Sequence, residues 1–216
     1  MSFNLENESL LASDLKENRQ LLEYGKKLDE LTKQFVGHMK PPREAVEKAK
    51  VLFHWLWERK PGRYKLGGQF RLTDVIDAEL SEDNRAVGNC LGLTLLYNCL
   101  LRRVGVHTDA LYLDDAFGIG PHILTLLYVG KSTIDVENIL PDGFDYKRHL
   151  DDPSRMKWGD KELVADIYHS RGNECFGEGE FAKALNSYEM AIKLNPQYEK
   201  AHLNKAILMD KLGTGR

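Results

Sequence analysis

The segment Gly88–Gly105, GNCLGLTLLYNCLLRRVG, decides the fold of this sequence. After Asn89, apolar residues cover most of the circumference of a helix, and charge returns only at Arg102 and Arg103. A helix that is apolar nearly all round lies buried at the centre of a domain. Gly105 stands where a helix commonly ends, because glycine adopts the left-handed conformation without strain. We therefore expect one buried helix around which the rest of a domain packs.

Three apolar segments after this helix have the composition of strands. They lie at residues 108–113, 122–129 and 132–138. The last two are separated by Gly130 and Lys131, and a two-residue loop that begins with glycine is typical of a type II′ hairpin. In that register Val129 pairs with Ser132, and the pairing continues outward from there.

Three helices are expected before the central one. Apolar residues recur at helical spacing over residues 21–35 and 46–57, and Thr73 is a candidate cap for a short helix at residues 74–80. The first stripe spans about two heptads, which is short for a coiled coil, so we interpret it as a helix docked on its own core. Pro41 and Pro42 should end it. Helices followed by antiparallel strands on a central helix indicate an α+β fold.

Composition excludes several functional classes. The 216 residues carry a net charge of −3 without a long run of Lys or Arg, so nucleic acid is not an expected partner. No apolar run approaches the ~18 residues of a membrane span, and the first residues are acidic and polar, unlike a signal peptide. Three cysteines cannot all pair within one chain. We expect free thiols, a cytoplasmic location and no membrane contact.

The C-terminal part follows the 34-residue tetratricopeptide pattern of small and aromatic positions. These positions are Tyr168, Gly172, Ala184, Tyr188, Ala191 and Pro196. Arg171 and Cys175 depart from the pattern, since leucine and tyrosine are usual there. Glu199 begins the next repeat by spacing, so the sequence predicts a repeat and a half.

A polar stretch separates the two parts and is interpreted as a linker. The chain then divides into a domain at residues 1–150, a linker at 151–163 and an all-helical repeat segment at 164–216. A repeat and a half cannot bury its faces alone, because about three repeats are usually needed. We expect it to dock on the first domain or on another subunit, and self-association through the incomplete repeat is one partner hypothesis.

Cys90 is the candidate nucleophile. It opens the central helix, where the positive end of the helix dipole favours a thiolate, the form that attacks electrophiles. The alternative is a buried, inert thiol, which is common. Cys99 lies mid-helix, roughly 13.5 Å further along the axis, and is expected to be inert. Cys175 falls inside the repeat and is interpreted as a packing residue.

His122 opens the second expected strand and is the candidate base for Cys90. Its orienting acid should come from the third strand, where Glu137 and Asp135 both qualify by type. In the hairpin register Glu137 is a diagonal neighbour of His122, at roughly 7–8 Å, which side chains can bridge. Asp135 is four residues away from it in register, or about 13 Å, which is too far without a bulge. Glu137 is therefore the preferred acid and Asp135 the second choice.

In this order the residues resemble the transglutaminase-like superfamily, a variation on the papain-type Cys-His-acid arrangement. The resemblance covers roughly residues 45–140 and rests on Gly88-Asn89-Cys90-Leu91, the Leu-Arg-Arg-x-Gly at 101–105, His122 and the strand bearing Asp135 and Glu137. It is greatest with the branch of that superfamily that couples this domain to tetratricopeptide repeats. The resemblance implies a papain-like fold in which Cys90 is the nucleophile, His122 the base and an acid the orienter.

Two functions remain open from the sequence. One is a cysteine-dependent acyl-transfer enzyme, a protease, amidase or transglutaminase, acting on an amide of a protein or peptide, with the Cys90 N–H or Gln69 as oxyanion donor. The other is an inactive scaffold of the same fold that binds protein partners through the repeat. The seven histidines lack metal spacing and no P-loop is present, so no metal or other cofactor is expected.

Overall fold

The structure, a computed structural model, describes residues 3–39 and 44–214 and has an α+β fold. Pro41 and Pro42, expected to end a helix, lie outside these residues. Among the helices of these two ranges, none has the length and apolar character to cross a bilayer. The elements in chain order are α1 (Leu5–Ala12), α2 (Asn18–His38), α3 (Ala45–Arg59), α4 (Leu72–Leu80), α5 (Cys90–Arg103), β1 (Thr108–Leu113), β2 (His122–Val129), β3 (Ser132–Val136), β4 (Met156–Trp158), α6 (Asp160–Gly177), α7 (Phe181–Leu194) and α8 (Glu199–Thr214).

Helix α5 is the buried centre of the fold, as its sequence predicts. Every residue from Leu91 to Leu101 is buried. The Asn89 side chain caps the helix by accepting a hydrogen bond from the Gly92 amide at 3.1 Å. At the other end Gly105 has a φ of 78°, and the Val106 amide donates to the Leu101 carbonyl at 2.9 Å. The Gly105 amide also donates to the Arg102 carbonyl at 3.0 Å, which completes a Schellman motif at the C-terminus. Both ends of the helix that begins at Cys90 are therefore capped.

A loop before α4 packs closely against the N-terminus of α5. The Asn89 amide donates to the Gln69 carbonyl at 2.9 Å. A Cβ atom at Gly92 would lie 2.4 Å from that same carbonyl oxygen, and one at Gly88 would lie 2.8 Å from it. Glycine is required at both positions because the two backbones touch. This contact holds Cys90 in place at the first turn of the helix.

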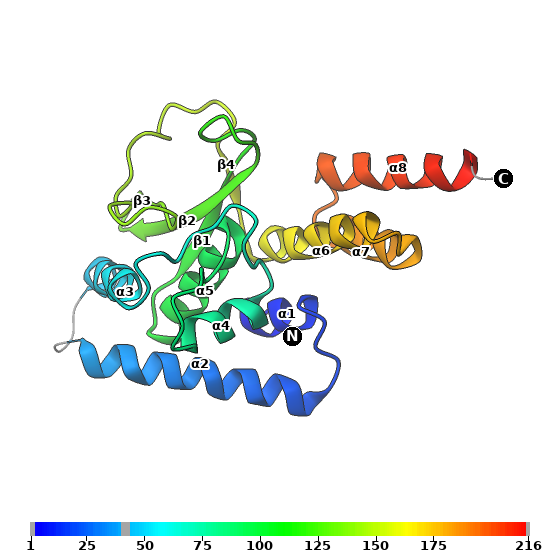
Figure 1. Cartoon of the computed structure of the whole chain (residues 1–216). Coiled ribbons are helices and arrows are strands. Elements are labelled where there is room, and N and C mark those ends of the chain that lie inside the picture. Colours follow the sequence, from blue (N-terminus) through cyan, green and yellow to red (C-terminus); the bar gives the residue numbers. More distant parts are fainter. Residues whose placement is uncertain (1–2, 40–43, 215–216) are drawn as a thin grey trace.

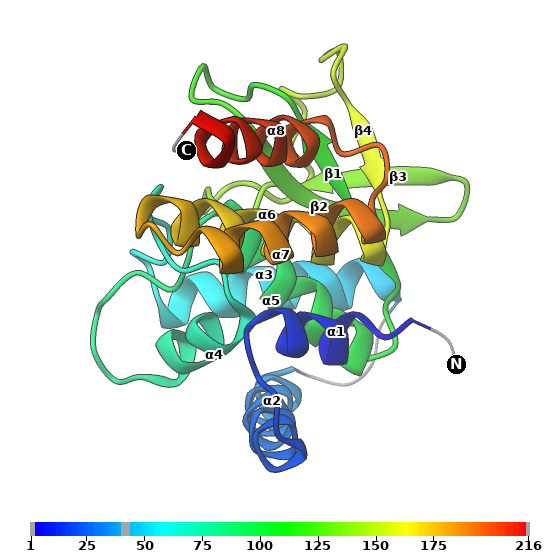
Figure 2. The same cartoon turned by 90° about the vertical axis from the view of Figure 1, so that its right-hand side faces the viewer.

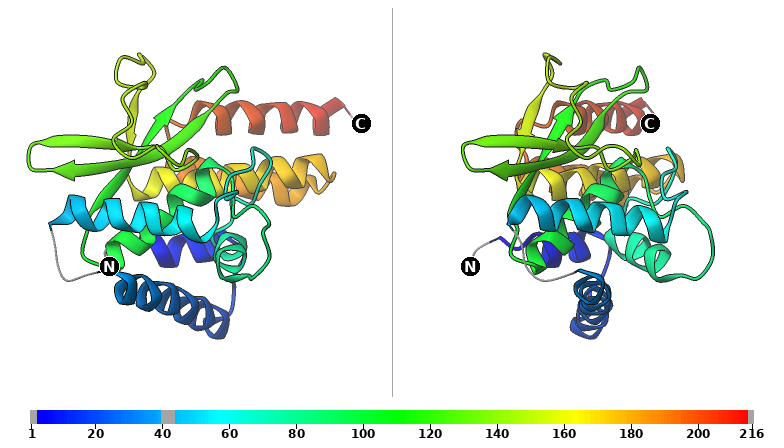
Figure 3. Two further views of the ribbon diagram at one scale, coloured as in Figure 1. Left: turned by 60° about the vertical axis from the view of Figure 1, so that its left-hand side comes forward. Right: turned by 90° about the vertical axis from the view of Figure 1, so that its left-hand side faces the viewer.

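The sheet is antiparallel and has the order β3-β2-β1-β4. Val129 pairs with Ser132 and Thr125 with Val136, which confirms the hairpin register. Gly130 has the positive φ, 60°, that the first position of this tight turn needs. The β2–β3 hairpin projects beyond the body of the domain, with α3 running beneath it (Figure 3).

The stretch interpreted as a linker, residues 151–163, contributes to the folded core. It contains strand β4, which pairs with β1, and the first turn of α6. The ring of Trp158 in β4 is buried and stacks on Tyr112 in β1 with ring centroids 4.2 Å apart. The sheet therefore gains its fourth strand from a segment whose polar composition does not resemble a strand.

The repeat segment is docked on the first domain through α6, and α7 and α8 extend from it to one side (Figures 1 and 2). Leu163, Val164 and Ile167 of α6 belong to the same hydrophobic core as α5. Arg171, which departs from the repeat pattern, donates to the Ala12 carbonyl at 2.8 Å. This residue therefore belongs to the docking contact with α1.

Because the inner face of α6 completes the main core, residues 160–216 expressed alone should not fold as a unit. We expect a weakly helical peptide whose far-ultraviolet circular dichroism changes gradually on heating, whereas the full chain unfolds in a cooperative transition. The full chain is the control. A sharp, cooperative transition of the fragment would show that the repeat is stable without the first domain.

Candidate functional site

Cys90 is the first residue of α5 and is partly exposed. The N-terminal amides of a helix carry a partial positive charge, so this position favours an anionic side chain. The other two cysteines differ from it. Cys99 is buried and its pKa is raised well above the ordinary value by burial. Burial also raises the pKa of Cys175. Within the described residues, Cys90 alone combines a helix N-terminus with partial exposure.

His122 is the first residue of β2 and is buried. Its Nε2 lies 2.8 Å from Oε2 of Glu137, which follows the end of β3. The carboxylate itself has no exposed surface. The structure thus brings His122 and Glu137 together, across the diagonal that the hairpin register predicts.

The charge state of His122 is set by its two neighbours. Burial lowers its pKa, but hydrogen bonding to the Cys90 and Glu137 side chains outweighs this and raises the pKa to about 10. Burial raises the pKa of Glu137, whereas hydrogen bonds from His122 and His149 lower it more, so the net pKa is below the ordinary value. At neutral pH the pair is therefore an imidazolium and a carboxylate.

Asp135, the second choice for the orienting acid, is engaged elsewhere. Its two oxygens accept hydrogen bonds from the guanidinium of Arg155, at 2.6 and 3.1 Å. The structure does not bring Asp135 to His122. A buried carboxylate with a forked arginine partner is fully compensated, so this side chain has a structural contact of its own.

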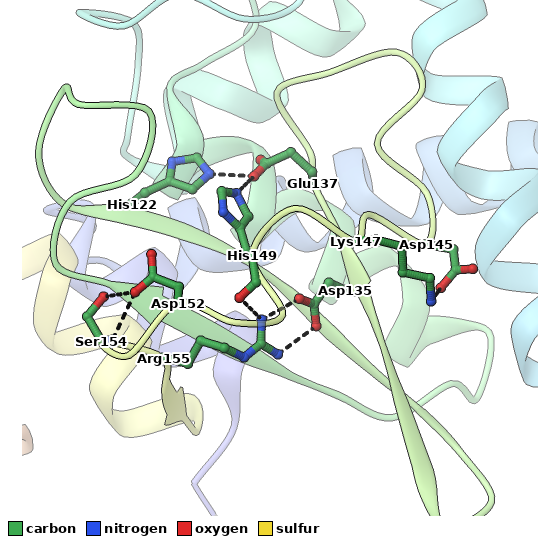
Figure 4. Close-up of polar contacts among 9 residues, drawn as sticks. All are labelled: His122, Asp135, Glu137, Asp145, Lys147, His149, Asp152, Ser154 and Arg155. Carbon is green, nitrogen blue, oxygen red and sulfur yellow. Dashed lines mark hydrogen bonds and ion pairs between the residues drawn. The ribbon is translucent and has the colours of Figure 1, made fainter.

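Sequence reasoning missed His149. Its Nε2 lies 3.2 Å from Oε2 of Glu137, the same oxygen that His122 contacts, and the residue is 5% exposed. Figure 4 shows the two imidazoles converging on the carboxylate from different segments. His149 lies in an irregular segment between β3 and β4, where no spacing rule connects it to either partner. The sequence offered no signal for it.

His122, Glu137 and His149 are the group in the described residues with the donor set for a metal ion. Their ligand atoms lie within 4.8 Å of one another. The hydrogen bonds at 2.8 and 3.2 Å account for the cluster without an ion.

Two residues near Cys90 bear on the oxyanion donor. The side chain of Gln69 is exposed, and its backbone carbonyl accepts from the Asn89 amide. Tyr64, which sequence reasoning did not single out, lies close enough for its pKa to be raised by burial and then by the charges of Cys90 and Glu137. Its backbone pairs with Gly88 in an isolated bridge. Tyr64 therefore adds a hydroxyl group to the surroundings of Cys90.

The repeat segment carries a separate groove of about 150 Å³ between α6 and α8, with α7 contributing to its lining. It is lined by Asn173, Phe176, Tyr188, Asn204 and Ile207. The Asn204 amide donates to Oδ1 of Asn173 at 2.8 Å, and Ile207 is half exposed. Oδ1 of Asn173 also accepts from the Tyr188 hydroxyl at 3.0 Å, so amide groups and apolar side chains lie side by side in the groove.

Comparison with known proteins supports the repeat. The tetratricopeptide repeat family matches residues 165–198, which confirms the repeat predicted from the sequence. Over 75 residues the chain is 35% identical to Hsp70-Hsp90 organizing protein 1 of Arabidopsis thaliana, covering 32% of this chain and 13% of that protein. Over 49 residues it is 41% identical to an uncharacterized protein of Methanocaldococcus jannaschii, covering 23% of this chain and 57% of that protein. No solved structure matches.

The chain spans less than two thirds of both relatives. Tetratricopeptide repeats are typical of protein–protein interaction, so the repeat indicates a protein-binding surface in this chain. The family match at 165–198 does not reach Cys90, His122 or Glu137. The chemistry of those residues is argued from their geometry.

Because the pKa of His122 is raised in the folded protein, the free energy of unfolding should depend on pH. A raised pKa contributes stability that is fully present below the unfolded value, about 6.5, and is lost as pH rises through about 10. Glu137→Gln removes the carboxylate, so this variant should unfold at lower urea concentration than the wild type. The difference in free energy of unfolding should be largest just below pH 6.5, above the lowered pKa of Glu137, and shrink toward pH 10.

Glu82→Gln, at an exposed position, is the matched control and should shift neither midpoint nor pH dependence. A difference between the Glu137→Gln variant and wild type that stays constant from pH 6 to pH 10 would mean that Glu137 does not hold a charged His122.

Proposed function

We propose that this chain is a cysteine-dependent acyl-transfer enzyme of the transglutaminase-like type that acts on an amide of a protein or peptide. Two observations support the proposal: the bond between His122 and Glu137, and the effect of the Cys90 side chain on the pKa of His122. Both side chains raise the pKa of His122, and Glu137 contacts its Nε2 at 2.8 Å. A nucleophile, a base and an orienting acid arranged in this order are the parts of a papain-type site.

In the first half of the reaction, the Cys90 thiolate attacks the amide carbonyl carbon. A carbon–sulfur bond forms and the carbonyl electrons move to oxygen. His122 then gives its proton to the amide nitrogen, the carbon–nitrogen bond breaks, and the amine leaves. A thioester on Cys90 and a neutral His122 remain. Glu137 holds the imidazole in the orientation and tautomer that make this transfer possible.

In the second half, His122 takes a proton from the acceptor, whose oxygen or nitrogen attacks the thioester. The tetrahedral adduct collapses, the carbon–sulfur bond breaks, and the thiolate and imidazolium are restored. Water as acceptor gives hydrolysis, and an amine gives cross-linking. We favour hydrolysis in the cytoplasm, where water is the abundant acceptor, with no cofactor.

A second candidate function rests on the groove between α6 and α8. In that case the first domain is a scaffold and the repeat binds a segment of a protein partner. The apolar residues Leu203, Ile207 and Met209 of α8 are exposed, which also fits self-association through this helix. The two functions are compatible in one chain, since the groove and Cys90 lie on different elements.

The proposed function predicts that Cys90 is the reactive thiol of the chain. At pH 7.5, iodoacetamide should alkylate Cys90 at least about tenfold faster than Cys175, because only a thiolate reacts and Cys90 faces an imidazolium. Cys99, which is buried, should stay unmodified while the protein is folded. Peptide mass spectrometry after timed quenching gives the three rates within one sample.

In His122→Asn, Cys90 should lose most of its faster alkylation relative to Cys175, since asparagine cannot carry the positive charge of the imidazolium. His202→Asn, at an exposed site on α8, is the matched control and should leave the rates unchanged. A Cys90 that reacts no faster than Cys175 would end the catalytic proposal and leave the scaffold function.

A further inference from the structure

Oxygen Oε2 of Glu137 is shared by two histidines. His122 Nε2 lies 2.8 Å from it and His149 Nε2 lies 3.2 Å from it. Both rings and the carboxylate are buried. A carboxylate oxygen can accept two hydrogen bonds, and two donors fix its direction more closely than one. The catalytic proposal uses only the first of these bonds.

The segment that carries His149 is tied back to β3. The guanidinium of Arg155 donates to the His149 carbonyl at 2.9 Å, and it also forks onto Asp135 at 2.6 and 3.1 Å (Figure 4). Asp135 lies two residues before Glu137. Both ends of the contact between His149 and Glu137 are therefore anchored to β3. Glu137 directly follows its last residue, and His149 is held through Arg155 and Asp135.

Phe117 covers this arrangement. Its ring meets the ring of His122 edge-on at 5.6 Å and that of His149 at 5.0 Å between centroids. Tyr146 adds a further ring contact to His149 at 4.9 Å. Aromatic contacts of this kind hold the imidazole planes and limit the access of water. The direction of the carboxylate is thus set by protein groups.

We infer that His149 is a positioning residue for the catalytic pair, holding the Glu137 carboxylate toward His122, with the Asp135–Arg155 ion pair holding His149 in turn. This inference rests on the proposed function. His149 does not contact the reacting atoms and acts only through Glu137. Asp135, the second choice for the acid on sequence grounds, then acts indirectly, because it anchors Arg155, which holds His149.

The direction in which the pKa of His122 changes when His149 is removed distinguishes a positioning role from simple competition for the Glu137 carboxylate. The titratable or charged groups around His122 are Cys90 of α5, Tyr64 of the loop before α4, Glu137, His149, and beyond them Asp135 and Arg155. If His149 positions Glu137, its removal lets the carboxylate turn away and the pKa of His122 falls. If His149 only competes for the carboxylate, its removal strengthens the bond to His122 and that pKa rises.

The experiment compares His149→Ala with His149→Gln, whose amide can still donate to Glu137. In the full chain, NMR titration of the imidazole signals should place the pKa of His122 about one unit lower in His149→Ala than in wild type and close to wild type in His149→Gln. The alkylation rate of Cys90 at pH 7.5 should fall about tenfold in the first variant and recover in the second.

Arg155→Lys keeps the charge but loses the fork, and should lower the pKa of His122 in the same direction by less. It replaces His149→Ala should that variant not fold. His202→Ala is the matched control. An unchanged or higher pKa of His122 in His149→Ala would overturn the inference. A wild-type Cys90 without enhanced reactivity would overturn the proposed function instead, while the NMR titration would still decide the role of His149.

Discussion

A buried carboxylate is the constraint on which this structure depends. Glu137 has no exposed surface, and an ionised group taken out of water is costly unless other groups satisfy it. His122 and His149, from two different segments, form hydrogen bonds with the carboxylate and stabilise it. The Glu137 amide donates to the Gly143 carbonyl at 2.8 Å. A Cβ at Gly143 would lie 2.0 Å from the Glu137 carbonyl oxygen, so only glycine fits there. The backbone after β3 therefore turns back sharply and brings the His149 segment over the sheet.

A second set of contacts fixes the position of Cys90. Helix α5 is fixed by its Asn89 cap and by the close contact of Gly92 with the loop at Gln69. A helix held at its first turn places its N1 residue accurately relative to the sheet. Burial lowers the pKa of His122, at the start of β2, but hydrogen bonding to the side chain of Cys90 contributes to raising it. Preorganisation of this kind lowers the reorganisation needed during a reaction.

The sequence predicted those parts of the structure that depend on local pattern. Helix α5, the hairpin register and the repeat follow from apolar periodicity, Gly130 and the tetratricopeptide spacing. Helix α1 and strand β4 were not predicted, because α1 is short with polar flanks and β4 has three residues that depend on pairing with β1. His149 was missed because its position depends on the irregular return after β3. Such tertiary contacts have no period in the sequence.

The central claim is that Cys90 is a nucleophile whose reactivity depends on His122. The most direct measurement is intact-protein and peptide mass spectrometry after brief exposure to an activated acyl ester, p-nitrophenyl acetate. The account predicts an acetyl group on Cys90 that forms rapidly, disappears as the thioester turns over, and is strongly reduced in His122→Asn. Acetylation confined to lysine side chains, or acetylation of Cys90 at the same rate in His122→Asn, would contradict it.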